Sequence, residues 1–239
     1  MDKKSPLGWG DDSLSAFIET VKNNIYATFA NHRAVFNRIQ KIDEAFRFAV
    51  DHLYNTKEWF PSFFLLRAHS AYLGAARLSL SFQVGEAYMV LRGCLENALY
   101  GFFFYKNPKK AHLWYERHDS IIKRKEVRRE FQIKRMIEAL KEENNQVAQV
   151  ATILYERCID YGAHPNERSI SSVLEKSEEG RNIYFTIYYL PGDTLPAKAC
   201  LKTTAQVGVC CLRVFELIFK TRFELMGLSD RVKELQKGL

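Results

Sequence analysis

The sequence has few residues that break regular structure and lacks the motifs of the common catalytic and cofactor-binding sites. Twelve glycines and six prolines are few for 239 residues, and the composition is that of a basic, helical domain. A Gly-rich phosphate loop, HExxH, paired CxxC, GxSxG and an EF-hand loop are all missing. The six histidines have no metal-ligand spacing. These absences argue against P-loop nucleotide hydrolysis and zinc hydrolysis, and we expect no metal and no cofactor.

Disulfide and membrane signatures are also missing. The five cysteines form an odd number without regular spacing, which predicts reduced thiols, mostly in the core of a cytosolic protein. The N-terminal residues do not resemble a signal peptide. The most apolar region, 63–105, contains several charged or titratable side chains, which argues against a membrane span: Arg67, His69, Arg77, Glu86, Arg92 and Glu96. We therefore expect a cytoplasmic protein.

The positive charge is concentrated in one segment. The chain has 35 Lys plus Arg and 28 Asp plus Glu, a formal net charge of +7. Residues 106–141 contain 12 basic and 5 acidic side chains, so this segment alone accounts for the whole excess.

Apolar residues recur at helical spacing along most of the chain. The pattern covers 11–60 with room for one break, 62–105 as a second helix, a basic helical region at 108–164 and C-terminal helices at 200–239. Residues 165–199 differ: a capping-box string at Ser172–Glu175 predicts a short helix, followed by an extended stretch or hairpin near 181–199. We predict one all-α domain, an antiparallel bundle of four to five long helices with a small irregular or β-like insertion.

Arg157 and His164 are the most suggestive candidate catalytic residues. They are seven residues apart, so an unbroken helix would place both on one face, where a guanidinium binds phosphate and an imidazole transfers a proton. Gly162 and Pro165 indicate that the helix ends there, so the two groups would have to meet across a helix terminus. The alternative is structural: His164 hydrogen-bonds a loop, and Arg157 pairs with an acidic neighbour or another helix.

The Arg-x6-His string at the end of a helix resembles the signature of the HEPN superfamily, small helical domains of prokaryotic defence and toxin systems. The strings Val90–Glu96 and Tyr161–Pro165 also resemble a bacterial helical family with an LRxxxE helix and a later His-Pro. The HEPN resemblance, over about Ala71–Phe219, implies a metal-independent endoribonuclease whose Arg and His face each other across a dimer. It assigns Arg157 to the scissile phosphate and His164 to general acid or base catalysis.

Arg92 and Glu96 are candidate supporting residues, since they lie four positions apart near the apolar face of the second predicted helix. Charges in such a place need partners. Either they form an internal ion pair that fixes the helix register, or Glu96 orients His164 or Arg157.

The basic run at 123–135 is the candidate nucleic-acid-binding surface. Clustered cations displace counterions from phosphates without reading bases, whereas interleaved acids are typical of a solvated helix face. The candidate contacts are Lys123, Arg124, Lys125, Arg128, Arg129, Lys134 and Arg135.

Two hypotheses of function follow. The first is a HEPN-like protein that binds or cleaves RNA or nucleotides, with the basic segment as its electrostatic surface. The second is a non-catalytic helical interaction module. Under both hypotheses we expect a homodimer that does not act at a membrane.

Overall fold

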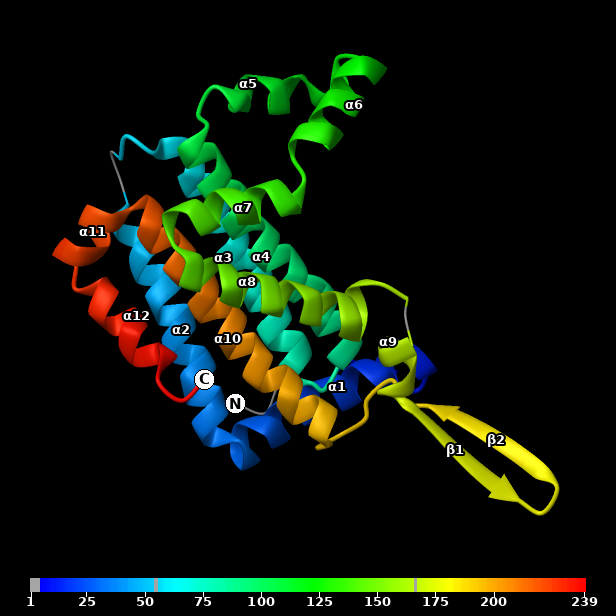
Figure 1. Ribbon diagram of the computed structural model, residues 1–239. Coiled ribbons are helices and arrows are strands. Elements are labelled where there is room, and N and C mark those ends of the chain that lie inside the picture. Colours follow the sequence, from blue (N-terminus) through cyan, green and yellow to red (C-terminus); the bar gives the residue numbers. More distant parts are fainter. Residues whose placement is uncertain (1–4, 54–55, 166) are drawn as a thin grey trace.

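The structure is a computed structural model that describes residues 5–53, 56–165 and 167–239. It confirms the predicted all-α bundle with a small β insertion (Figure 1). The long helices are α1 Ser13–Asn31, α2 Arg33–His52, α3 Trp59–Leu80, α4 Val84–Lys106, α8 Asn145–Cys158 and α10 Leu195–Ile218. The shorter helices are α5 Lys110–Tyr115, α6 Ile121–Glu130, α7 Ile133–Glu143, α9 Glu167–Ser171, α11 Lys220–Leu225 and α12 Leu228–Gln236. A 3-10 turn spans Glu116–His118, a π-helical turn spans Ile159–Ala163, and the strands are β1 Leu174–Glu179 and β2 Asn182–Ile187.

Helices α4 and α10 form the centre of the bundle. Helix α10 contacts α2, α3, α4, α8 and α12, and most of its side chains are buried. Its approach to α2 and α3 is close at Gly208, where an added Cβ would lie 2.5 Å from the Tyr72 ring and 2.6 Å from Ile42. A side chain at this position would force the core apart.

Several helices begin or end where the sequence predicts. The side chain of Asp12 accepts hydrogen bonds from the amides of Leu14 and Ser15, which caps α1. The expected break within 11–60 falls at His32, and α4 ends at Lys106, directly before Asn107-Pro108. The boundaries at Asp12 and Asn107 are set by local hydrogen bonds and could therefore be predicted from the sequence.

The predicted second helix over 62–105 is wrong, because the chain reverses at Ser81–Gln83 and forms two antiparallel helices, α3 and α4. Phe82 adopts a φ of 66°, the left-handed region that a bulky residue rarely occupies. The turn is held from outside: Thr28 of α1 donates a hydrogen bond of 2.8 Å to the carbonyl of Leu80. Local hydrogen bonds close the same turn without a glycine or proline: the amide of Gln83 donates to the carbonyl of Leu78 at 3.0 Å, and the hydroxyl of Ser81 donates to that carbonyl at 2.9 Å.

The insertion also differs from the prediction. The hairpin covers 174–187 rather than 181–199, α10 begins at Leu195 with Pro196 in its first turn, and Glu175 of the expected capping box lies in β1. The short helix α9 precedes that string. The strands pair from Leu174 with Ile187 to Glu179 with Asn182, leaving a two-residue turn whose first residue, Gly180, has a φ of +64°, as such turns require.

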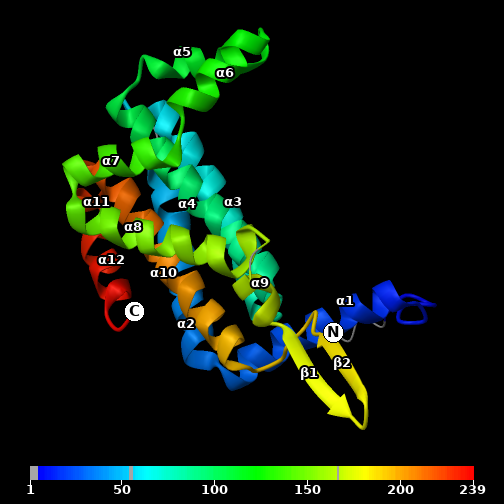
Figure 2. The ribbon, with the colours of Figure 1, turned by 45° about the vertical axis from the view of Figure 1, so that its right-hand side comes forward.

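Two segments project from opposite ends of the bundle: α5 with α6, and the β1–β2 hairpin (Figure 1, Figure 2). All five cysteines are free and buried, as predicted. Burial raises the pKa of Cys158 and of Cys210 to about 12. Within the described ranges, no helix combines the length and the apolar character needed to cross a membrane.

Candidate functional site

Helix α6 carries most of the candidate cations and is anchored to the bundle at a few points. Ser120 caps the helix by accepting a hydrogen bond of 3.1 Å from the amide of Lys123, and Val127 is the buried residue of the helix. At its end, Glu130 pairs with Lys110 of α5 and, at 2.9 Å, with Arg135 of α7. The hydrogen bond from Lys110 is the main cause that holds the pKa of Glu130 below its usual range. This carboxylate therefore links the three short helices of the basic region.

The acids of the region neutralise some of the candidate cations and not others. Lys123 pairs with Glu116 at 2.8 Å and lies 3.9 Å from Glu126, and Arg135 pairs with Glu130. Within the described part of the chain, the remaining candidates have no carboxylate within 4.0 Å, and all are exposed: Arg124, Lys125, Arg128, Arg129 and Lys134.

Four of these unpaired cations share one face of α6. Successive helix residues are about 100° apart, so Arg128 lies opposite Glu126 and Glu130, with Arg124 and Lys125 on either side of it. Arg129 lies next to Lys125, at the border with Glu126. We call Arg124, Lys125, Arg128 and Arg129 the outward face of α6. Ile121 and Ile122 at the start of the helix are 72% and 77% exposed. The outward face is thus a concentrated positive surface whose four cations form no ion pair with the acids of the described residues.

Arg157 lies between α8 and α10. Its Nη1 atom donates hydrogen bonds to Thr203 Oγ1 at 3.2 Å and to Gln206 Oε1 at 2.7 Å. Both acceptors are neutral, and no carboxylate among the described residues lies within ion-pair distance. Arg157 and Gln206 line both a cavity of about 420 Å³ against the α8–α10 face and a second one of about 390 Å³ that also includes Lys202. The guanidinium can therefore bind an anion without first breaking an ion pair with a carboxylate.

The π-helical turn after α8 sets the position of His164. Gly162 packs directly on the start of α4, where an added Cβ would lie 2.2 Å from the carbonyl oxygen of Gly85. The wider turn changes the helical phase, so the two-turn spacing of Arg157 and His164 does not place them on a common helix face. His164 follows in an extended conformation and is exposed. No hydrogen bond joins it to Arg157 in the described part of the chain.

Arg92 and Glu96 form the ion pair that their spacing suggests, with Arg92 Nε 2.8 Å from Glu96 Oε1. Tyr155 of α8 completes the contact: its hydroxyl accepts from Arg92 at 3.2 Å and donates to Glu96 at 3.1 Å. Burial is the main cause that raises the pKa of Tyr155. The pair therefore ties α4 to α8, and no hydrogen bond among the described residues links it to Arg157 or His164.

Sequence reasoning did not identify the partners of these groups. Tyr155 is 59 residues from Glu96, and Gln206 is 49 residues from Arg157. No sequence motif around Tyr155 or Gln206 predicts these contacts. Such contacts are visible once the packing of α8 on α4 and α10 is known.

No group of three or more His, Cys, Asp or Glu side chains in the described ranges is arranged to hold a metal ion. Comparisons of the chain with protein-family models, with curated proteins and with solved structures find no match.

Proposed function

We propose that this is a cytoplasmic protein that binds RNA or nucleotide phosphates through the outward face of α6. The observation that carries the proposal is the separation of charge in the basic segment. The acids pair with Lys110, Lys123 and Arg135, while Arg124, Lys125, Arg128 and Arg129 are exposed on one face without a carboxylate partner within the described ranges. A cation that is already paired gains little from a phosphate, whereas an unpaired one releases counterions when it binds.

The resemblance to HEPN proteins extends this proposal to catalysis without a metal. In that extension Arg157 holds the scissile phosphate, and His164 transfers a proton at the 2′-hydroxyl or the leaving oxygen. Two observations support it: the guanidinium of Arg157 lies beside a cavity without an acidic partner among the described residues, and His164 is exposed. The two residues would then act together across a dimer.

Binding is tested with two matched double variants. Arg124→Ala/Arg128→Ala and Lys123→Ala/Arg135→Ala each remove two positive charges from the same segment, so their effects on net charge are equal. Anisotropy of a labelled single-stranded RNA should show the larger loss of affinity for the first variant. Equal losses would mean that the protein responds to RNA through net charge alone, and an unaltered affinity in the first variant would refute the proposed surface.

Catalysis is tested by incubating RNA with the protein in chelator. Cleavage by the wild type should be lost in Arg157→Ala and in His164→Ala, and kept in His112→Ala, which removes another exposed imidazole. If the wild type leaves RNA intact, the catalytic proposal is refuted. The binding proposal is tested separately by the double variants.

A non-catalytic helical interaction module is the second candidate function. The observation that favours it is that three candidate residues serve as connectors between helices: Arg157 bonds to α10, and Arg92 with Glu96 bonds to α8. Under this hypothesis, Arg157→Ala lowers the melting temperature, while RNA remains uncleaved and unbound by every variant.

A further inference from the structure

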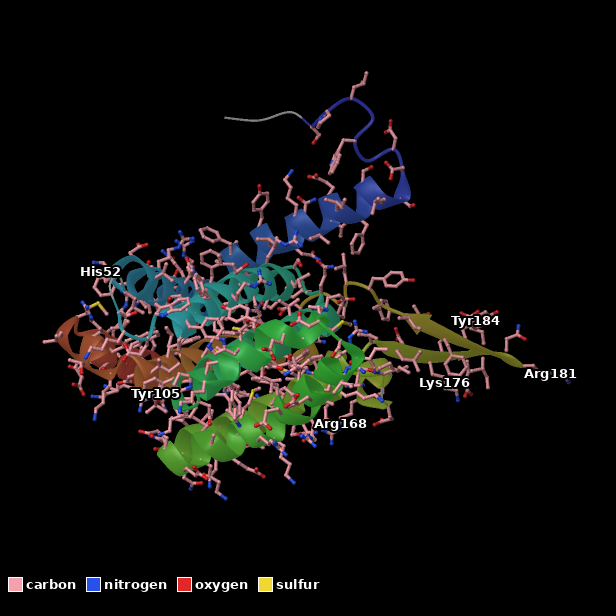
Figure 3. The ribbon with its side chains drawn as sticks, turned by 90° about the horizontal axis from the view of Figure 1, so that it is seen from above. His52, Tyr105, Arg168, Lys176, Arg181 and Tyr184 are labelled. Carbon is pink, nitrogen blue, oxygen red and sulfur yellow. The ribbon has the colours of Figure 1, made fainter. Side chains whose placement is uncertain are left out.

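The β1–β2 hairpin extends away from the helices with both of its faces open. Every residue of β2 is exposed, and Figure 3 shows the side chains of Tyr184, Lys176 and Arg181 standing off the ribbon with no helix beside them. A two-stranded hairpin is marginally stable in water when nothing covers it. Contact with another protein surface would therefore stabilise the hairpin.

One face of the hairpin is apolar along its second strand. Ile183, Phe185 and Ile187 alternate along β2 and so point to the same side of the sheet. They are 55%, 65% and 55% exposed. Contiguous exposed apolar side chains of this kind mark sites of protein association.

The two outer edges of the hairpin differ in charge. Strand β1 carries Glu175, Glu178 and Glu179 beside one lysine, whereas β2 carries no charged residue. Charged side chains are a common protection of an edge strand against pairing with another chain. The edge of β1 is protected in this way, and the edge of β2, which has no further strand beside it in the described part of the chain, is not.

The apolar pattern of β2 is symmetric about its middle. Isoleucine stands two residues before and two residues after Phe185, so the stripe reads the same in both directions. A strand with that property matches an antiparallel copy of itself, because a two-fold axis through Phe185 places each Ile183 opposite the partner's Ile187. Thr186 would lie opposite the partner's Tyr184, and these aromatic and β-branched pairs are favourable across strands.

We propose that β2 is the dimer interface of this protein, where it pairs antiparallel with β2 of a second copy to form a four-stranded sheet. The two-fold arrangement closes on itself, since each copy uses its one unprotected edge. Pairing through β1 instead would bring glutamates of the two copies together. The hairpin projects from the end of the bundle opposite α6 (Figure 2), so this proposal does not depend on RNA binding.

The test is a charge exchange at Phe185, read by light scattering after size-exclusion chromatography of the full chain. The wild type should elute with twice the chain mass, whereas Phe185→Lys and Phe185→Glu alone should each elute with the mass of one chain. An equimolar mixture of the two should recover the doubled mass, because lysine then faces glutamate across the axis. Ser177→Lys is the control, since it adds the same charge to β1 and should keep the dimer.

Three results would overturn the proposal: a wild type with the mass of one chain, a Phe185→Lys variant with the mass of two chains, or a mixture of the two charged variants that keeps the mass of one chain. If the doubled mass is recovered on mixing, the hairpin must be folded in both variants. Loss of the dimer in each variant alone would then not be due to a misfolded hairpin.

Discussion

Replacing Gly162 by alanine tests the contact that sets the geometry between Arg157 and His164. The π-helical turn packs so closely on α4 that the new Cβ would lie 2.2 Å from the Gly85 carbonyl oxygen, 2.9 Å from its carbonyl carbon and 3.0 Å from Tyr88 Cβ. Two of these neighbours are backbone atoms, which cannot rotate away as a side-chain end can. The turn must therefore move off α4, or the start of α4 must shift.

The cost follows from the size of the overlap. Overpacking a well-packed site by one methyl group costs about 1–3 kcal/mol, while replacing glycine in a helix with alanine returns about 0.5–1 kcal/mol. The difference spans about 0–2.5 kcal/mol, and because the approach of 2.2 Å is to a backbone atom, we expect a net destabilisation in the upper part of this range, about 1–2 kcal/mol. For a chain of this length each kcal/mol lowers the melting temperature by about 2–4 °C.

Gly93→Ala in α4 is the matched control. An added Cβ at Gly93 meets no atom within 4 Å, so this variant should be as stable as the wild type or more stable by up to about 1 kcal/mol. Thermal unfolding followed by circular dichroism at constant scan rate measures both variants. If Gly162→Ala unfolds at the same temperature as Gly93→Ala, the close packing of the π-helical turn on α4 is refuted.

Three further predictions concern the thiols, the basic region and the α4–α8 contact. The five buried cysteines should resist a thiol-labelling reagent in the native protein and all react in denaturant, because burial keeps the reagent away from the thiols; rapid labelling of the native protein would contradict this. Glu130 should stabilise α6 at neutral pH and lose that effect as the pH falls through its lowered pKa, since Lys110 and Arg135 favour the charged form. The protection of α6 amides from exchange, relative to the intrinsic rate at each pH, should fall in acid for the wild type and already be low at neutral pH in Glu130→Gln; equal protection in both proteins at neutral pH would contradict this. Tyr155→Phe removes the hydroxyl that joins the ion pair of α4 to α8 and should cost about 1 kcal/mol in urea unfolding; an unaltered midpoint would show that the hydroxyl contributes nothing.

The parts of the fold that could be predicted depend on local chemistry. Periodicity located the helical regions, Asp12 marked the start of α1, and Asn107-Pro108 marked the end of α4. The reversal between α3 and α4 could not be found in this way, since its left-handed residue is Phe82 and part of its hydrogen-bonding support comes from Thr28 on another helix. A local pattern predicts neither a phenylalanine in the left-handed region nor a hydrogen bond from a distant helix.

In the candidate site, too, contacts between residues near one another in sequence could be predicted, and contacts between distant residues could not. The basic segment and the pairing of Arg92 with Glu96 were visible because the residues involved are near one another in sequence. Which cations stay unpaired was not visible, because Lys110 reaches Glu130 across 20 residues. Gly162 and Pro165 did predict that the helix ends before His164, and the structure confirms it. The π-helical form of the last turn is not revealed by periodicity.

The salt dependence of RNA binding tests the central claim most directly. For single-stranded nucleic acid, the logarithm of the binding constant falls against the logarithm of salt concentration with a slope of about −0.7 for each phosphate neutralised. If the outward face of α6 contacts one phosphate with each of its four cations, replacing all four by alanine should reduce the slope by about 3 units. The same slope in the wild type and in the variant Arg124→Ala/Lys125→Ala/Arg128→Ala/Arg129→Ala would contradict the claim that this face binds RNA.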